Sequence, residues 1–280
     1  MADWGKIFSR GNVEDRRSIS PVAMGGIGLA GILLYLVVNI ITDGQVNIPL
    51  EQLQEISGSA QQPQNTTEFE GQDTYEVFVS TVLGSNNDMW ASVFDNSQNS
   101  YTPPRLVLFR SATESACGVA TSQVGPHYCP LDATIYLDET FFDELTQRYG
   151  AEGGDVAEAY IISHEVGHHA QNELGIIDMV DREIQQDEGT ANELSVKLEL
   201  QADCFAGLWA YSIRDLDVLS PGEISEAMDA ASAVGDDRIQ ETVTGRVNPE
   251  NWTHGSSEQR ISWFTRGYES GNVSSCDTFN

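Results

Sequence analysis

Two histidines four residues apart, with a glutamate directly after the first, are the residues of this chain best suited to chemistry: His164, Glu165 and His168. On a helix, residues i and i+4 share a face, so both imidazoles can bind one ion from the same side. Zinc favours neutral imidazole nitrogens in a tetrahedral shell. Glu165 points further round the helix, where it can reach a water on the metal and accept its proton. The pattern predicts a zinc site with its own general base, and the alternative is a chance pairing of helical histidines.

The residues around this motif predict the helix that must carry it. The chain over about 156–174 is apolar on several sides, which indicates a largely buried helix. Asp155 and Glu158 have the spacing of a capping box at its start, and Gly175 suits its end. His169 lies about 100° from His168 around such a helix, so we expect it to support the structure or a ligand.

A catalytic zinc usually has three protein ligands and a water, so two imidazoles leave the site one ligand short. Thr190 and Glu193 form another possible capping box, which opens a predicted helix that runs to about Ile213. Glu199 and Asp203 share one face of this helix, so Glu199 could bind zinc while Asp203 orients a ligating imidazole. The alternative is a solvated acidic face, and the apolar neighbours of both residues favour burial instead.

Two segments, AYIISHEVGHHAQN over 159–172 and LELQADCFAG over 198–207, resemble a family of bacterial neutral zinc metallopeptidases. Shorter matches extend through nearly the whole chain: 13–17, 116–118, 124–126, 128–130, 136–138, 231–237 and 253–260. The resemblance implies a gluzincin-like peptidase that holds one zinc ion per chain. It implies His164, His168 and Glu199 as the zinc ligands and Glu165 as the base.

A peptide bond attacked by water develops an oxyanion, which a second electrophilic side chain can stabilise. His254 is our candidate, because it lies in a loop just before a helix that Ser256 can cap. The alternative is an ordinary hydrogen-bonded loop histidine. The run 134–137 is predicted to be a strand, and an edge strand could pair with an extended substrate. Tyr136 could line the cleft there, although a core aromatic is the favoured interpretation.

An uncharged run of 23 residues, Ile19–Ile41, is long enough to cross a bilayer as a helix. A cleavable signal peptide has a shorter apolar core and an Ala-x-Ala-like site, neither of which this chain offers, and a buried core helix is the other alternative. Four basic residues precede the run, and the next one is Arg105. The positive-inside rule then predicts a single-pass anchor with a cytoplasmic N-terminus and an extracytoplasmic catalytic domain.

All four cysteines follow that run, as expected for a domain in an oxidising compartment. Local closure predicts two disulfides, Cys117 with Cys129 and Cys204 with Cys276, out of three possible pairings. A cysteine metal site is disfavoured because the chain has no Cys-x-x-Cys spacing.

These signals divide the chain into a cytoplasmic N-terminus (1–18), a transmembrane helix (19–41), a flexible polar linker (42–72) and a peptidase domain (73–280). We expect an α+β fold, mainly helical with a small β-sheet. Helices are predicted over about 73–95, 138–150 and 223–235, and a strand over 105–109. The net charge of −29 argues against nucleic acid as a partner.

The sequence thus predicts a membrane-anchored zinc peptidase that acts on peptides or proteins. The alternative is a silent or latent zinc-binding protein of peptidase fold that serves as a scaffold. The presence of Glu165 favours the enzyme, because a purely structural zinc site closes its shell and needs no base.

Overall fold

The computed structural model describes residues 2–18, 67–68, 74–95, 100–220 and 222–279. The predicted membrane span 19–41 and nearly all of the predicted linker 42–72 lie outside the described residues. Among the helices in the described ranges, none combines the length and the apolar character needed to cross a membrane.

The described strands form one five-stranded sheet and one hairpin. The sheet has the order β2-β1-β3-β7-β6, in which β1, β3 and β7 run parallel and the outer strands β2 and β6 run antiparallel to their neighbours. Its strands are β1 (Asn12–Asp15), β2 (Thr67–Glu68), β3 (Arg105–Phe109), β6 (His127–Cys129) and β7 (Thr134–Asp138). The hairpin consists of β4 (Ala112–Ser115) and β5 (Gly118–Thr121).

The predicted strand over 134–137 is present as β7, but it is not the edge of the sheet. It lies between β3 and β6, and every residue of β7 is buried. Tyr136 is accordingly a core side chain, 2% exposed. The edge of the sheet next to β7 is β6, and its three residues are too few to give an alternating pattern in the sequence.

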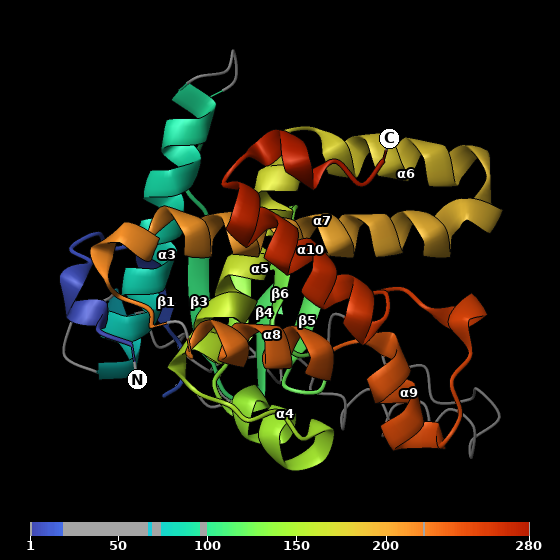
Figure 1. Cartoon of the computed structure of the whole chain (residues 1–280), viewed down its shortest axis with the longest axis horizontal. Coiled ribbons are helices and arrows are strands. Elements are labelled where there is room, and N and C mark those ends of the chain that lie inside the picture. The colour runs from blue at the N-terminus through green and yellow to red at the C-terminus, as the bar shows by residue number, and fades with distance from the viewer. Residues whose placement is uncertain (1, 19–66, 69–73, 96–99, 221, 280) are drawn as a thin grey trace, which may run out of the picture.

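Helices make up most of the fold (Figure 1). One face of the sheet packs against helices in the main core, and the opposite side chains of β3 and β7 form a small cluster with Ala120 of the hairpin. The α-helices are α3 (Thr74–Asp95), α4 (Phe141–Tyr149), α5 (Asp155–Glu173), α6 (Ile176–Gln186), α7 (Ala191–Ser212), α8 (Ile224–Ala233), α9 (Asp236–Thr244) and α10 (Ser257–Ser270). Short 3-10 turns are η1 (Trp4–Lys6), η2 (Glu188–Thr190), η3 (Arg214–Leu216), η4 (Pro249–Asn251) and η5 (Val273–Cys276). The fold is a mixed α/β fold, mostly helical with small sheets, which confirms that part of the prediction.

Helix α5 is a buried central helix, as its apolar sequence predicted, but its start differs from the prediction. Its N-cap is Gly154, and no side chain caps the first turn. The Asp155 carboxylate instead accepts hydrogen bonds from the Ala2 backbone N–H (3.1 Å) and the Trp4 indole (2.8 Å). At the other end Gly175 has φ +71°, a left-handed conformation that favours glycine.

Helices α7 and α10 pack with their backbones in direct contact. A Cβ atom at Gly207 would lie 2.0 Å from the Phe264 carbonyl oxygen, and one at Gly267 would lie 2.0 Å from the Cys204 carbonyl oxygen. Only glycine permits this approach, because any larger residue would overlap a carbonyl group of the facing helix. Figure 1 shows α10 crossing close to α7 and α5.

Both disulfides join the predicted partners. The Cys117–Cys129 bond attaches the β4–β5 hairpin to the edge strand β6, and the Cys204–Cys276 bond attaches the C-terminal turn η5 to α7. The fold thereby holds both the strand and the helix that border the candidate site.

Residues 2–18, expected to form a separate cytoplasmic segment, pack onto the domain. Ile7 and Val13 are buried in the main core, and β1 is hydrogen-bonded to β3 in the middle of the sheet. Arg17, which the positive-inside rule counted as a topology signal, forms ion pairs with carboxylates of the domain, including Glu76 and Glu139. Residues 2–18 and the domain therefore share one sheet and one hydrophobic core.

Candidate metal centre

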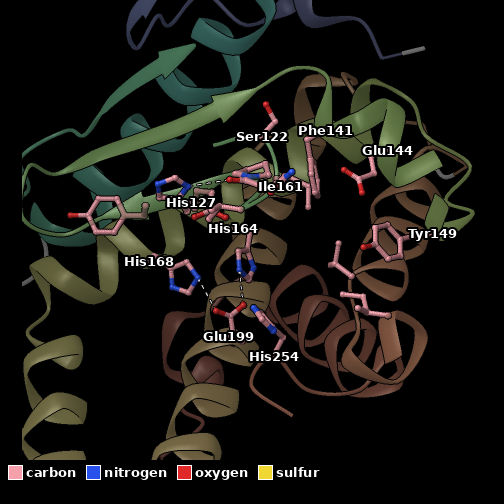
Figure 2. A pocket seen from close by; sticks show the side chains of 18 of the residues that line it. Ser122, His127, Phe141, Glu144, Tyr149, Ile161, His164, His168, Glu199 and His254 are labelled. Carbon is pink, nitrogen blue, oxygen red and sulfur yellow. Dashed lines mark hydrogen bonds and ion pairs between the residues drawn. The ribbon is translucent and has the colours of Figure 1, made fainter. Parts of the chain in front are cut away.

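Helices α5 and α7 bring together the three predicted zinc ligands. His164 Nε2 lies 3.1 Å from Glu199 Oε2, and His168 Nε2 lies 3.3 Å from Glu199 Oε1. One donor atom from each residue falls within 4.8 Å of the other two, the one such group of His, Cys, Asp or Glu side chains among the described residues. Figure 2 shows the three side chains converging from the two helices. Two imidazoles and a carboxylate are a donor set that fits zinc with an open fourth position.

Each imidazole has its outer nitrogen fixed by a hydrogen bond, which leaves Nε2 for a metal. His164 Nδ1 lies 2.8 Å from Asp203 Oδ1, so it donates to that carboxylate. His168 Nδ1 lies 2.8 Å from Gln171 Oε1, an oxygen that can only accept. Partners of this kind set the tautomer and the ring orientation of metal-binding histidines.

Asp203 is itself the centre of a buried network. Its carboxylate is fully buried and also accepts hydrogen bonds from the Tyr160 hydroxyl, Arg260 Nε (2.8 Å) and Arg260 Nη2 (2.9 Å). Arg260 is 3% exposed, and its charge compensates the charge of Asp203 in a region that water does not reach.

The charges of the site favour a cation among the three ligands. Burial lowers the pKa of His164, but the carboxylates of Asp203 and Glu199 outweigh burial and raise that pKa to about 10. Burial raises the pKa of Glu199, but the two imidazoles outweigh it and bring the pKa well below its ordinary value. The same negative potential stabilises a divalent metal ion at this position.

Glu165 lies beside the ligands in a cleft of about 990 Å³, a size that suits a peptide segment. It is buried, 6% exposed, and lines the cleft together with all three ligands. Apolar side chains form the part of the cleft near α4, α8 and α9: Phe141, Tyr149, Ile161, Val234 and Ile239.

His254 also lines the cleft and lies beside Glu199 (Figure 2). Asp236 holds it in place, because Asp236 Oδ2 accepts hydrogen bonds from the backbone N–H groups of Thr253, His254 and Gly255. Asp236 Oδ1 lies 3.2 Å from His254 Nδ1. This hydrogen bond raises the pKa of His254, which favours the imidazolium form.

Four residues of the site had no role in the sequence-based prediction: Tyr160, Gln171, Asp236 and Arg260. Gln171 is the one that local spacing could have revealed, because it lies three residues after His168 on the same helix. The others meet the ligands only through the tertiary fold. His169 faces away from the ligands and bonds to Tyr128 and Thr102, in agreement with its expected supporting role.

The model of the family described as "Putative neutral zinc metallopeptidase" matches residues 2–279. The chain belongs to this family. It is 42% identical over 277 residues to the "Uncharacterized protein YpfJ" of Escherichia coli (strain K12), which covers 96% of this chain and 95% of the relative. It is 47% identical over 190 residues to the "Uncharacterized protein Rv2575" of Mycobacterium tuberculosis, 64% of each chain. No solved structure matches the chain.

Proposed function

We propose that this family member is a zinc-dependent peptidase that hydrolyses peptide bonds in its cleft. The observation that carries the proposal is the convergence of His164, His168 and Glu199 within 4.8 Å beside the buried carboxylate of Glu165. A zinc site that only stabilises a fold has four protein ligands and no adjacent base.

His164, His168 and Glu199 would hold the zinc ion. When bound, zinc supplies a Lewis acid that polarises the scissile carbonyl and lowers the pKa of water. Glu165 accepts a proton from the attacking water and then donates it to the leaving amine. His254, kept in its protonated form by Asp236, donates a hydrogen bond to the oxyanion that develops on the carbonyl.

We propose that the substrate binds as an extended peptide along β6. This strand is the edge of the described sheet on the side of the cleft, and His127 and Tyr128 line the cleft. The free backbone edge of a strand can pair with an extended peptide and so supply binding that does not depend on side chains.

We also propose that the chain is attached to a membrane through residues 19–41, whose uncharged sequence of 23 residues supports the attachment. A net charge of −29 supports peptides rather than nucleic acid as the substrate.

The test is cleavage of casein or a peptide library by the purified full chain. Hydrolysis should stop with a chelator and return with zinc. The Glu165→Gln variant should bind one zinc per chain and lack turnover, because the ligands remain while the base is lost. A Glu165→Gln variant as active as the wild type would refute the role of the base, and zinc binding without any cleavage would favour the scaffold alternative.

A further inference from the structure

The side chain of Tyr128 hydrogen-bonds the edge strand β6 to the metal-binding helix α5. The Tyr128 hydroxyl oxygen lies 3.2 Å from Asn172 Nδ2 and 3.0 Å from His169 Nδ1. His169 Nε2 lies 2.7 Å from the carbonyl oxygen of Thr102, and the His169 side chain is completely buried.

Burial lowers the pKa of His169 and so favours a neutral ring, for which the chemistry of these atoms allows one arrangement of protons. The Thr102 carbonyl can only accept, so His169 Nε2 carries the proton of a neutral imidazole and Nδ1 is an acceptor. The Tyr128 hydroxyl therefore donates to Nδ1, and its oxygen accepts from the Asn172 amide. The result is a directed chain of hydrogen bonds from Asn172 through Tyr128 and His169 to Thr102, in which each of these donors has its acceptor.

The chain of hydrogen bonds connects the two parts of the cleft that must be aligned. Asn172 is one helical turn beyond His168, so it moves with the metal ligands. Tyr128 belongs to the strand that we propose as the docking edge, and the next residue, Cys129, is fixed by its disulfide to Cys117. The rings of Tyr128 and His169 also pack edge to face at 5.4 Å between centroids.

We propose that Tyr128 is a positioning residue: through His169 and Asn172 it holds β6 at a fixed distance from the metal-binding helix, and hence determines how well an extended peptide binds along β6. This proposal rests on the proposed peptidase function and on docking at β6. Tyr128 acts on the substrate through the strand and takes no part in the bond-breaking step.

The test replaces the hydroxyl alone, in the zinc-loaded full chain. Tyr128→Phe removes the link. Tyr136→Phe is the matched control, because Tyr136 lies on the neighbouring strand β7 and its hydroxyl donates one partly buried hydrogen bond, to Asp132 Oδ2 at 2.9 Å. We expect Tyr128→Phe to raise KM for a long peptide about tenfold and to leave kcat within about twofold, since uniform substrate binding is lost. The control should leave both constants within about twofold of wild type. Zinc affinity should not change in either variant.

Equal changes of KM in the two variants, an unchanged KM in Tyr128→Phe, or a loss of zinc affinity in that variant would overturn the proposal. Hydrogen exchange of the segment 125–130 supplies a readout that needs no activity. Exchange should rise in Tyr128→Phe and in Asn172→Ala, and no rise in either would also overturn it. If the wild type cleaves no peptide but exchange rises in both variants, the peptidase function fails while the attachment of β6 by Tyr128 stands.

Discussion

Replacing Asp203 with asparagine should be among the most damaging isosteric changes in the chain. Asp203 is fully buried and compensates Arg260, which is 3% exposed and bonded to it twice. Asparagine keeps the shape but removes the negative charge, which leaves the buried guanidinium with the more distant Glu199 carboxylate, 3.8 Å away, as its remaining counter-ion among the described residues. Breaking a buried ion pair in this way costs about 3–5 kcal/mol of unfolding free energy. The Asp203 bond to His164 Nδ1 also weakens, and loss of such a partner lowers metal affinity roughly 10–100-fold.

The assay is denaturant unfolding of the metal-free protein, with zinc affinity measured separately by competition with a chromophoric chelator. Glu193→Gln is the control, because Glu193 forms an exposed ion pair with Lys197, and such surface pairs contribute little to stability. The double variant Asp203→Asn with Arg260→Gln should be more stable than Asp203→Asn alone, because the buried charge that lost its bidentate partner is gone. An Asp203→Asn protein that unfolds within about 1 kcal/mol of wild type and binds zinc equally well would refute this reasoning.

Three further predictions concern stability and topology. Burial raises the pKa of Glu158 from its ordinary value of 4.5 to about 7, so this carboxyl binds a proton more tightly in the folded protein than in the unfolded chain. The free energy of unfolding should therefore fall as the pH rises from 4.5 to 7. Glu158→Gln should therefore raise the unfolding free energy at pH 8 by at most roughly 3 kcal/mol, seen as a higher melting temperature there and not at pH 4. An equal gain at both pH values would contradict this prediction. Gly267→Ala should separate α10 from α7 and lower the unfolding free energy by several kcal/mol, on the order of the large values known for overpacking, and a calorimetric change below about 1 kcal/mol would show that the helices can move apart freely. Cysteines introduced at the exposed Phe8 and at Ser262 should react equally with a membrane-impermeant maleimide in intact cells, because β1 pairs with β3. Labelling at position 262 alone would mean that residues 2–18 and the domain lie on opposite sides of the membrane.

The sequence identified the parts of the site that depend on local spacing. The residues His164, Glu165 and His168 lie within one turn and a half of α5, and Glu199 lies on one face of α7 with Asp203, so helical periodicity alone relates them. The Cys117–Cys129 pairing was predicted from a separation of 12 residues, which left Cys204 with Cys276, 72 residues apart. Capping was predicted less well: Ser256 caps α10 as expected, in a capping box with Gln259 that was not predicted, whereas Asp155 and Thr190 make no side-chain cap. Asp155 is used instead by Ala2 and Trp4, a tertiary contact that no local rule contains.

What the sequence could not supply are the residues that hold the ligands from a distance. Arg260 is 57 residues beyond Asp203 and reaches it only because Gly207 and Gly267 let α10 contact the backbone of α7. The same reasoning explains the N-terminal segment. A basic cluster before an apolar run is a local pattern, and it predicted membrane topology, but Arg17 is paired with carboxylates 59 and 122 residues away. The ion pairs of Arg17 and the place of β1 beside β3 arise from the tertiary fold, so no count of charges along the chain could have predicted them.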